Sequence, residues 1–216
     1  MTPFIVAKSS EDKRGRVDER QLPEKSPWMK NAFLLGLLLA MCTLPASRAE
    51  NPVASFQGAL AATASVQGPA RGSAAEKAAI DRFENFLANL DEKTAREETT
   101  KVYAPDAYLN DTLKTLHGSA AIREYFIRTA QGLDSMKVIF DDLAVSGRNY
   151  YFRWTMDTRM KHLAPGKTIR TIGVTMVRFD PQGRVILHQD FWDSAQGVWD
   201  HVPVLGTMIR WIQSKI

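Results

Sequence analysis

Four strand candidates follow one another in the second half of the chain, and this succession constrains the fold more than any other feature. They cover residues 136–146, 149–161, 167–180 and 184–194. The intervening Gly147-Arg148 and Pro181-Gln182-Gly183 are short turn sequences that suit hairpins, and "LAPGK" at residues 163–167 reads as a loop. The order therefore predicts an antiparallel meander.

Helical patterns precede this meander. The first begins at Ser73, where Glu76 three residues later completes a capping box. Its apolar residues recur at helical spacing and comprise Ala79, Ile80, Phe83, Phe86, Leu87 and Leu90. A second helix is expected from about Glu92 to Tyr103, and a third from Ser119 to Gly132. Between them, "APDAYLND" predicts a brief strand.

Helices first and strands afterwards predict an α+β fold. We expect a cone-shaped, curved antiparallel sheet with about three N-terminal helices packed on its concave face. Such a sheet leaves a cavity between its strands and the helices, which is a natural ligand site. A C-terminal amphipathic helix is expected over residues 201–216, and its apolar side comprises Leu205, Met208, Ile209, Ile212 and Ile216.

Residues 29–49 have the layout of a secretory signal peptide. Lys30 is positive, residues 33–44 are mostly apolar, and the segment ends in the small-x-small sequence Ser47-Arg48-Ala49. The apolar run of about 12 residues is shorter than the roughly 20 that span a bilayer as a helix. We therefore expect cleavage after Ala49 and a periplasmic or secreted protein. The alternative is a protein anchored in the membrane by residues 33–44.

The segments on either side of this leader are expected to be irregular. Residues 1–28 mix both charge signs and make a poor start for a signal peptide, so we expect them to be a mis-assigned start or a disordered leader, with translation beginning at Met29. Residues 50–73 are rich in Ala, Ser and Gly and predict a flexible spacer. The folded domain is then expected over residues 74–200.

The charge balance gives no sign of nucleic-acid binding. The full chain has 28 basic and 24 acidic residues, but residues 1–49 hold 8 and 5 of these, which leaves 20 and 19. No basic stripe is visible downstream, so the high isoelectric point belongs partly to the leader. The single cysteine, Cys42, lies in the apolar run, so a chain cleaved after Ala49 has no disulfide.

Four stretches, in this order, resemble the nuclear transport factor 2-like superfamily. They are "VYAPDAYLND", "HGSAAIREYF", "MVRFDPQGRV" and "DFWD". The superfamily includes steroid Δ-isomerases and SnoaL-like polyketide cyclases, and the resemblance covers roughly residues 74–200. It implies the cone-shaped fold. It does not imply one function, because this fold hosts enzymes, binding proteins and structural proteins.

The resemblance also locates the residues of a steroid isomerase site. The general base matches Asp111, but the tyrosine oxyanion donor falls at or next to Phe86 and the acidic donor falls on Thr175. Loss of such a donor costs roughly two to three orders of magnitude in rate. The resemblance therefore does not extend to steroid isomerisation by the family's mechanism.

Alternation along the strand at 184–194 implies which side chains face the cavity. His188, Asp190 and Trp192 would point inward, whereas the residues between them would point outward, where relatives dimerise. The ligand-binding candidates implied by the resemblance are Phe86, Tyr103, Phe152, Trp154, Met156, Thr175 and Trp192.

Asp111, His188 and Asp190 are the catalytic candidates. The last two stand on one strand face with Cβ atoms about 6–7 Å apart, so they can share a proton network with a ligand. Carboxylates buried in apolar pockets have raised pKa values and suit acid–base chemistry. The alternatives are a turn carboxylate at Asp111 and a buried structural pair at the other two positions.

Other kinds of site lack a motif. The chain has no HExxH, no paired CxxC, no Gly-rich phosphate loop and no Ser-His-Asp elbow. We expect no cofactor and no metal, although His188 with the two aspartates is the one set that could hold an ion.

Three functions remain open at this stage. The domain could be an enzyme that moves protons on a small apolar molecule, a non-catalytic binder of such a molecule, or a structural module that works through dimerisation. The expected partners are a small apolar molecule and a second copy on the outer sheet face, with no nucleic acid. Membrane contact is expected only through an uncleaved leader or the C-terminal helix.

Overall fold

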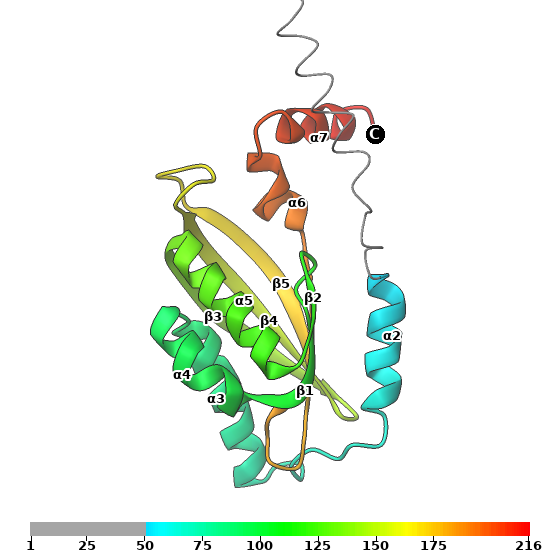
Figure 1. Ribbon diagram of the computed structural model, residues 1–216. Coiled ribbons are helices and arrows are strands. Elements are labelled where there is room, and N and C mark those ends of the chain that lie inside the picture. Colours follow the sequence, from blue (N-terminus) through cyan, green and yellow to red (C-terminus); the bar gives the residue numbers. More distant parts are fainter. Residues whose placement is uncertain (1–50) are drawn as a thin grey trace, which may run out of the picture. The chain divides into compact units, whose positions relative to one another are not determined.

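The predicted meander is present in the computed structural model, which describes residues 51–216; the predictions for residues 1–49 lie outside this range. Six strands form one curved sheet (Figure 1). The strands are β1 (Tyr103–Asn110), β2 (Thr115–His117), β3 (Leu133–Ser146), β4 (Asn149–Met160), β5 (Ile169–Phe179) and β6 (Val185–Trp192). Their order across the sheet is β2-β1-β6-β5-β4-β3. The α+β prediction is confirmed.

One pairing differs from the predicted antiparallel sheet. β1 runs parallel to β6, with Leu109 opposite His188, whereas the other neighbouring strands are antiparallel. The sheet is therefore mixed. This pairing places the end of β1, and with it Asp111, beside the end of β6, and local sequence patterns do not encode such a long-range register.

Three helices cover one face of the sheet, as predicted (Figure 1). They are α3 (Ala74–Ala88), α4 (Glu92–Val102) and α5 (Ser119–Gly132). The predicted cap of α3 is confirmed, because the Ser73 hydroxyl accepts a hydrogen bond of 3.1 Å from the Glu76 backbone N–H. The Glu76 carboxylate reaches back to the N–H of Gly72, one residue before the cap, which is a variant of the capping box.

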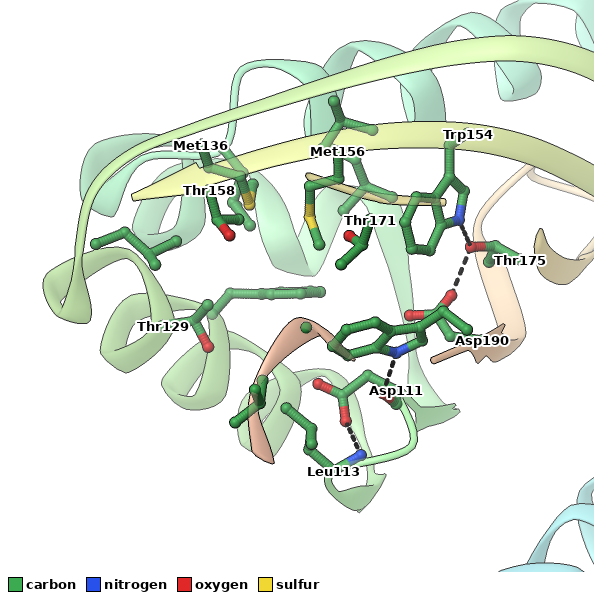
Figure 2. Close-up of a pocket in the computed structure, with 18 of the residues that line it drawn as sticks. Asp111, Leu113, Thr129, Met136, Trp154, Met156, Thr158, Thr171, Thr175 and Asp190 are labelled. Atoms are coloured by element: carbon green, nitrogen blue, oxygen red, sulfur yellow. Dashed lines mark hydrogen bonds between the residues drawn. The ribbon is translucent and has the colours of Figure 1, made fainter. Parts of the chain in front are cut away.

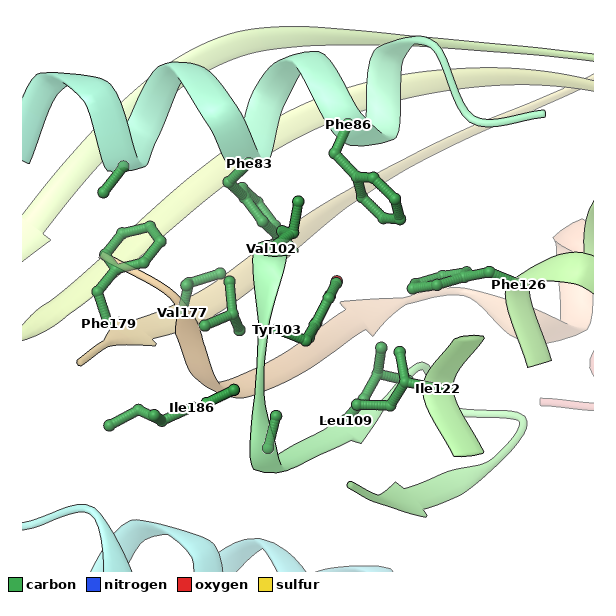
Figure 3. Packing of buried hydrophobic residues seen from close by; sticks show 14 of the residues in the cluster. Phe83, Phe86, Val102, Tyr103, Leu109, Ile122, Phe126, Val177, Phe179 and Ile186 are labelled. Carbon is green, nitrogen blue, oxygen red and sulfur yellow. The ribbon is translucent and has the colours of Figure 1, made fainter. Parts of the chain in front are cut away.

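The main hydrophobic core lies between these helices and the sheet (Figure 3). Its centre is aromatic: Phe83 of α3 lies 4.8 Å from Phe152 of β4, measured between ring centroids. Phe86 packs edge-on against Tyr103 and Phe126. These rings fill the closed end of the cone and leave the other end to the cavity described below.

The opposite face of the sheet carries a helix where the sequence predicts a flexible spacer. α2 (Pro52–Ala62) begins after Asn51, whose side chain caps it, and the spacer prediction for residues 50–73 is therefore wrong. Alanine favours helices, but an isolated helix of this length is marginal, so packing stabilises it. Phe56, Ala59 and Leu60 contact Tyr108, Met176 and Leu187 of the sheet.

Two arginines fix the C-terminal end of α2. Arg178 donates to the Leu60 carbonyl at 2.9 Å and to the Thr63 hydroxyl at 2.8 Å. Arg148 donates to the carbonyls of Thr63, Ala64 and Val66. They satisfy carbonyls that a helix end leaves without partners.

The helix changes the outer face on which a second copy is expected. Leu187 and Gln189 point outward as predicted, yet they are only 0% and 8% exposed. Leu187 packs against α2, and the Gln189 side chain hydrogen-bonds Tyr108 and Asn110. Phe191 stays half-exposed and meets Phe56 edge-on at 6.0 Å. Part of the expected dimer surface is thus already occupied by the chain itself.

Three short helical elements follow β6: α6 (Ser194–Gly197), the 3-10 helix η1 (Trp199–His201) and α7 (Leu205–Gln213). The C-terminal helix is present as predicted, but it packs on η1 and not on the sheet. Within residues 51–216, no helix has both the length and the apolar character needed to cross a membrane.

Candidate functional site

A cavity of about 210 Å³ opens between the sheet and α5 (Figure 2). One end is polar and holds Asp111 and Asp190. The other end is lined by methionines from β3 and β4, Met136, Met156 and Met160. Its volume is below the roughly 300–1,000 Å³ of pockets for drug-sized ligands, so it suits a small molecule.

Most of the residues proposed from sequence meet in this cavity. Its lining includes the catalytic candidates Asp111, His188 and Asp190 and the ligand-binding candidates Trp154, Met156, Thr175 and Trp192. Their roles in binding and catalysis stay predictions. Three other candidates, Phe86, Tyr103 and Phe152, belong to the aromatic core and are at most 4% exposed, so the prediction that they line the cavity is wrong.

A chain of hydrogen bonds converges on Asp190. The Trp154 indole N–H donates to the Thr175 hydroxyl at 2.8 Å, and that hydroxyl donates to Asp190 Oδ1 at 2.5 Å. From the other side, His188 Nε2 lies 2.9 Å from the same Oδ1. His188 Nδ1 lies 2.9 Å from the Tyr103 hydroxyl.

The indole fixes the direction of the first two bonds. An indole N–H can only donate, so the Thr175 hydroxyl accepts from it and is left to donate to Asp190. The other two bonds depend on the tautomer of His188: where Nε2 carries the proton and donates to Asp190, Nδ1 accepts the Tyr103 hydroxyl. In that tautomer every donor in the chain points towards Asp190.

Tyr103 thus takes part in the site from within the core. Burial, and then the nearby charge of Asp190, raises the pKa of the Tyr103 hydroxyl well above its usual value. The phenol stays protonated and donates to His188, which it holds in one orientation and one tautomer. Its role is to position His188 and not to contact a ligand.

The two oxygens of Asp190 differ in their surroundings. Oδ1 accepts from both Thr175 and His188, whereas no side chain or backbone group of residues 51–216 donates to Oδ2. The side chain is 15% exposed and lines the cavity. One oxygen is therefore held by the protein, and the other is available to a ligand.

Asp111 lies in a turn at the end of β1. Its Oδ1 accepts the backbone N–H groups of Leu113 and Lys114 at 3.0 and 2.8 Å, while Oδ2 accepts the Tyr125 hydroxyl. The next residue, Thr112, has a φ of 71°, a left-handed conformation that strains a β-branched residue. The turn-carboxylate alternative is thus correct as a description of its contacts, and the same contacts aim it at the cavity.

The environment of Asp111 shifts the pKa of its carboxyl. Burial raises this pKa above its usual value, hydrogen bonds from Tyr125 and the turn only partly offset the rise, and the charge of Asp190 adds to it. Burial and the charge of Asp111 also raise the pKa of Tyr125. Asp111 and Tyr125 therefore both hold their protons more strongly than the free side chains do.

Tyr125 was not among the residues proposed from sequence. It lies in "REYF" on α5, fourteen positions after Asp111, and only the packing of α5 beside the end of β1 brings the two together. The buried Thr171 hydroxyl also lines the cavity, and it has no hydrogen-bond partner in the described part of the chain.

Two tryptophans shape the cavity wall, and glycines make room for them. A Cβ at Gly173 would lie 2.4 Å from the Trp154 ring, and one at Gly197 would lie 2.2 Å from the Trp192 ring. Trp192 also donates its indole N–H to the Asp111 carbonyl at 2.7 Å, which ties β6 to the Asp111 turn. Among residues 51–216, no group of three or more His, Cys, Asp or Glu side chains is placed to hold a metal ion.

Comparison with known proteins agrees with this architecture. Residues 83–188 match the family model of the SnoaL-like domain, and no curated protein matches the chain. The structure of TsrD from Streptomyces laurentii is 17% identical, with a TM-score of 0.49 over 62% of this chain and 98% of that one. An LEH-like epoxide hydrolase from M. tuberculosis is 17% identical, with a TM-score of 0.46 over 62% and 95%. An NTF2-like protein of unknown function from Exiguobacterium sp. 255-15 is 15% identical, with a TM-score of 0.46 over 54% and 98%.

Residues 83–188 therefore match a SnoaL-like domain, which confirms the resemblance inferred from the sequence. The matched residues run from Phe83 of the first core helix to His188 of the last strand. They include Asp111 but end before Asp190 and Trp192, so the roles of these two side chains are argued from the geometry of the site.

Proposed function

We propose that this domain binds a small, largely apolar molecule in the cavity and moves a proton on it. Asp190 is the general base, and Asp111 with Tyr125 is the proton-donating side. The reaction class is an isomerisation, cyclisation or hydration, in which a proton leaves one atom and another is delivered nearby.

The observation that carries this proposal is that the two oxygens of Asp190 differ in their hydrogen bonds. Both hydrogen bonds end on Oδ1, and Oδ2 faces the cavity without a donor from the described residues. A proton taken by Oδ2 leaves Oδ1 able to accept from Thr175 and His188 as before. The base therefore works without rearranging its supports, which is the preorganisation that acid–base catalysis needs.

Asp111 complements this base because burial raises the pKa of its carboxyl, so it holds a proton more strongly than a free aspartate does. Tyr125, which donates to Asp111 Oδ2, also lines the cavity. A carboxyl whose pKa is raised by burial suits the acid role in proton transfer.

The same geometry argues against steroid isomerisation. The position of the tyrosine donor is filled by Phe86, which is 4% exposed in the core. The Thr175 hydroxyl donates to Asp190, so it is not free to stabilise an oxyanion.

The test is the pair Asp190→Asn and Asp193→Asn, assayed on the molecule that co-purifies with the protein and is identified by mass spectrometry. Asp190→Asn removes the base at nearly constant shape, so turnover should fall by about 10²–10⁴-fold while binding stays within a few-fold. Asp193 caps α6 outside the cavity lining, and asparagine also caps helices, so this control should keep full activity. Unchanged turnover in Asp190→Asn would refute the base.

Non-catalytic binding is the alternative. The buried Tyr103 hydroxyl and His188 Nδ1 hydrogen-bond each other, and this favours the alternative because such a bond can serve a purely structural role. In that case neither aspartate variant changes more than affinity, whereas Trp154→Ala weakens binding because it removes a wall of the cavity. A purely dimeric structural module has less support, because α2 covers part of the outer face.

We also propose that the active form is exported after cleavage behind Ala49, on the strength of the signal-like segment at residues 29–49. The intact mass of the protein recovered from the periplasm or medium tests this: a chain that begins at Glu50 is expected. Recovery of the uncleaved chain in the membrane fraction supports the anchored alternative.

A further inference from the structure

The C-terminal helix presents an uncovered row of large apolar side chains. Val204, Met208, Trp211 and Ile212 recur at helical spacing along one side, and their exposed fractions are 84%, 51%, 62% and 47%. Gly206 is the only buried residue of α7. Single exposed apolar residues are ordinary, but a contiguous row marks an interaction surface.

This row is held in place rather than loose. A Cβ at Gly206 would lie 2.0 Å from the Asp200 carbonyl oxygen, so the helix crosses η1 in close backbone contact. Arg210 donates to the same carbonyl at 2.8 Å. Val204, which precedes the helix, has a φ of 67°, a strained conformation for a β-branched residue. The structure thus supports the apolar row on its inner side and leaves the outer side open.

The charged side chains of α7 and of the residues that follow it are cations. Residues 201–216 contain Arg210 and Lys215 and no Asp or Glu. An amphipathic helix with an apolar face that includes tryptophan and with flanking cations suits the interface of an anionic bilayer, where the tryptophan sits at headgroup level. A helix of nine residues supplies a weak, reversible contact.

We propose that α7 docks the domain on an anionic phospholipid surface, with Trp211 and Ile212 in the interface and Lys215 at the headgroups. This contact is independent of the proton-transfer proposal, because none of its residues lines the cavity. While the leader is present, the contact of α7 adds to any membrane contact that the leader makes. The contact of α7 remains after the leader is cleaved.

The experiment uses residues 50–216, which form one compact unit with both hydrophobic clusters, so the leader cannot bind the vesicles. Sedimentation is measured with vesicles of phosphatidylglycerol mixed with phosphatidylcholine and with phosphatidylcholine alone. The domain should bind the anionic vesicles, and Trp211→Ser should lower partitioning roughly tenfold or more, since a large apolar group leaves the interface.

Two matched variants sharpen the result. Lys215→Gln should weaken binding to anionic vesicles roughly fivefold and leave binding to phosphatidylcholine unchanged. Ile172→Ser removes an apolar side chain that is 69% exposed on the sheet and should have no effect. Urea midpoints confirm that each variant is folded.

Two outcomes overturn the proposal. One is that Trp211→Ser binds anionic vesicles as strongly as the parent chain does, or that the parent chain binds neither kind of vesicle. The other is that the parent chain forms a dimer by size-exclusion chromatography, loses it in Trp211→Ser and does not bind vesicles, in which case a second copy is the occupant.

Discussion

Two threonines on β5 allow a direct test of the hydrogen-bond chain that supports Asp190. Thr175 and Thr171 are 1% and 4% exposed, and both line the cavity. The Thr175 hydroxyl accepts from Trp154 at 2.8 Å and donates to Asp190 at 2.5 Å. The Thr171 hydroxyl has no partner in the described structure. Replacement by valine removes one hydroxyl at nearly constant shape in each case.

The two variants should differ in sign as well as in size. Thr175→Val removes a hydrogen bond to a charged group, worth about 1.5–3 kcal/mol, and leaves a buried indole N–H without an acceptor, at about 1–3 kcal/mol. Because effects within one network are not additive, we expect a total loss of about 2–4 kcal/mol in the free energy of unfolding. Thr171→Val removes a buried hydroxyl that makes no hydrogen bond with the described residues, so the substitution should be neutral or should stabilise the fold by up to about 1 kcal/mol.

Urea unfolding followed by tryptophan fluorescence measures both changes. Each variant should shift the midpoint while the slope m stays constant, which shows that the native state is what changed. Equal losses in the two variants would refute the argument, because they would show that valine at either position costs stability through packing and not through hydrogen bonding.

Two further predictions concern stability and the cavity wall. Glu76 accepts hydrogen bonds from Tyr150, Gly72 and Arg71, and these lower the pKa of its carboxyl below 4.5; Glu76→Gln should therefore cost about 1–3 kcal/mol at neutral pH. Because the pKa of Glu76 is lowered in the folded state, this stabilisation is complete above about pH 5 and is lost as the pH falls through the folded pKa. The free energies of unfolding of the parent chain and of Glu76→Gln, measured by denaturant titration, should therefore converge in acid. If they diverge in acid, the sign of the argument is wrong. Gly173→Ala should displace the Trp154 ring, change the near-UV circular dichroism and cost about 1–3 kcal/mol, whereas Gly58→Ala in α2, where nothing lies within 4 Å, should be neutral or slightly stabilising; equal effects would contradict the steric argument.

Local patterns were sufficient to predict α3, α4, α5, the C-terminal helix and the long strands. The capping residue Ser73, the apolar stripe through Phe83 and the turn at residues 181–183 act over a few positions, so the sequence shows them directly. The alternation of strand side chains predicted which side of β6 faces inward, and therefore predicted that His188 and Asp190 line the site.

Long-range contacts account for what the sequence did not reveal. The parallel pairing of β1 with β6 and the approach of Tyr125 to Asp111 depend on packing between segments far apart in the chain. α2 was missed because its Ala- and Gly-rich sequence is typical of a linker, and its stability depends on contacts with the sheet and on Arg178. Tyr103 was placed in the cavity wall, yet its ring lies in the core and only its hydroxyl reaches His188.

The one-way hydrogen-bond chain has a consequence for how this domain can evolve. Trp154 can only donate, so position 175 must carry an acceptor that can also donate onward, and serine or threonine meets both demands. A tryptophan lost at 154 removes the need for an acceptor at position 175 but leaves the need for a donor to Asp190, whereas a residue without a hydroxyl at 175 leaves both the indole and Asp190 without this partner. Substitutions at these two positions should therefore be correlated among relatives, with the change at 154 coming first in any lineage that loses both.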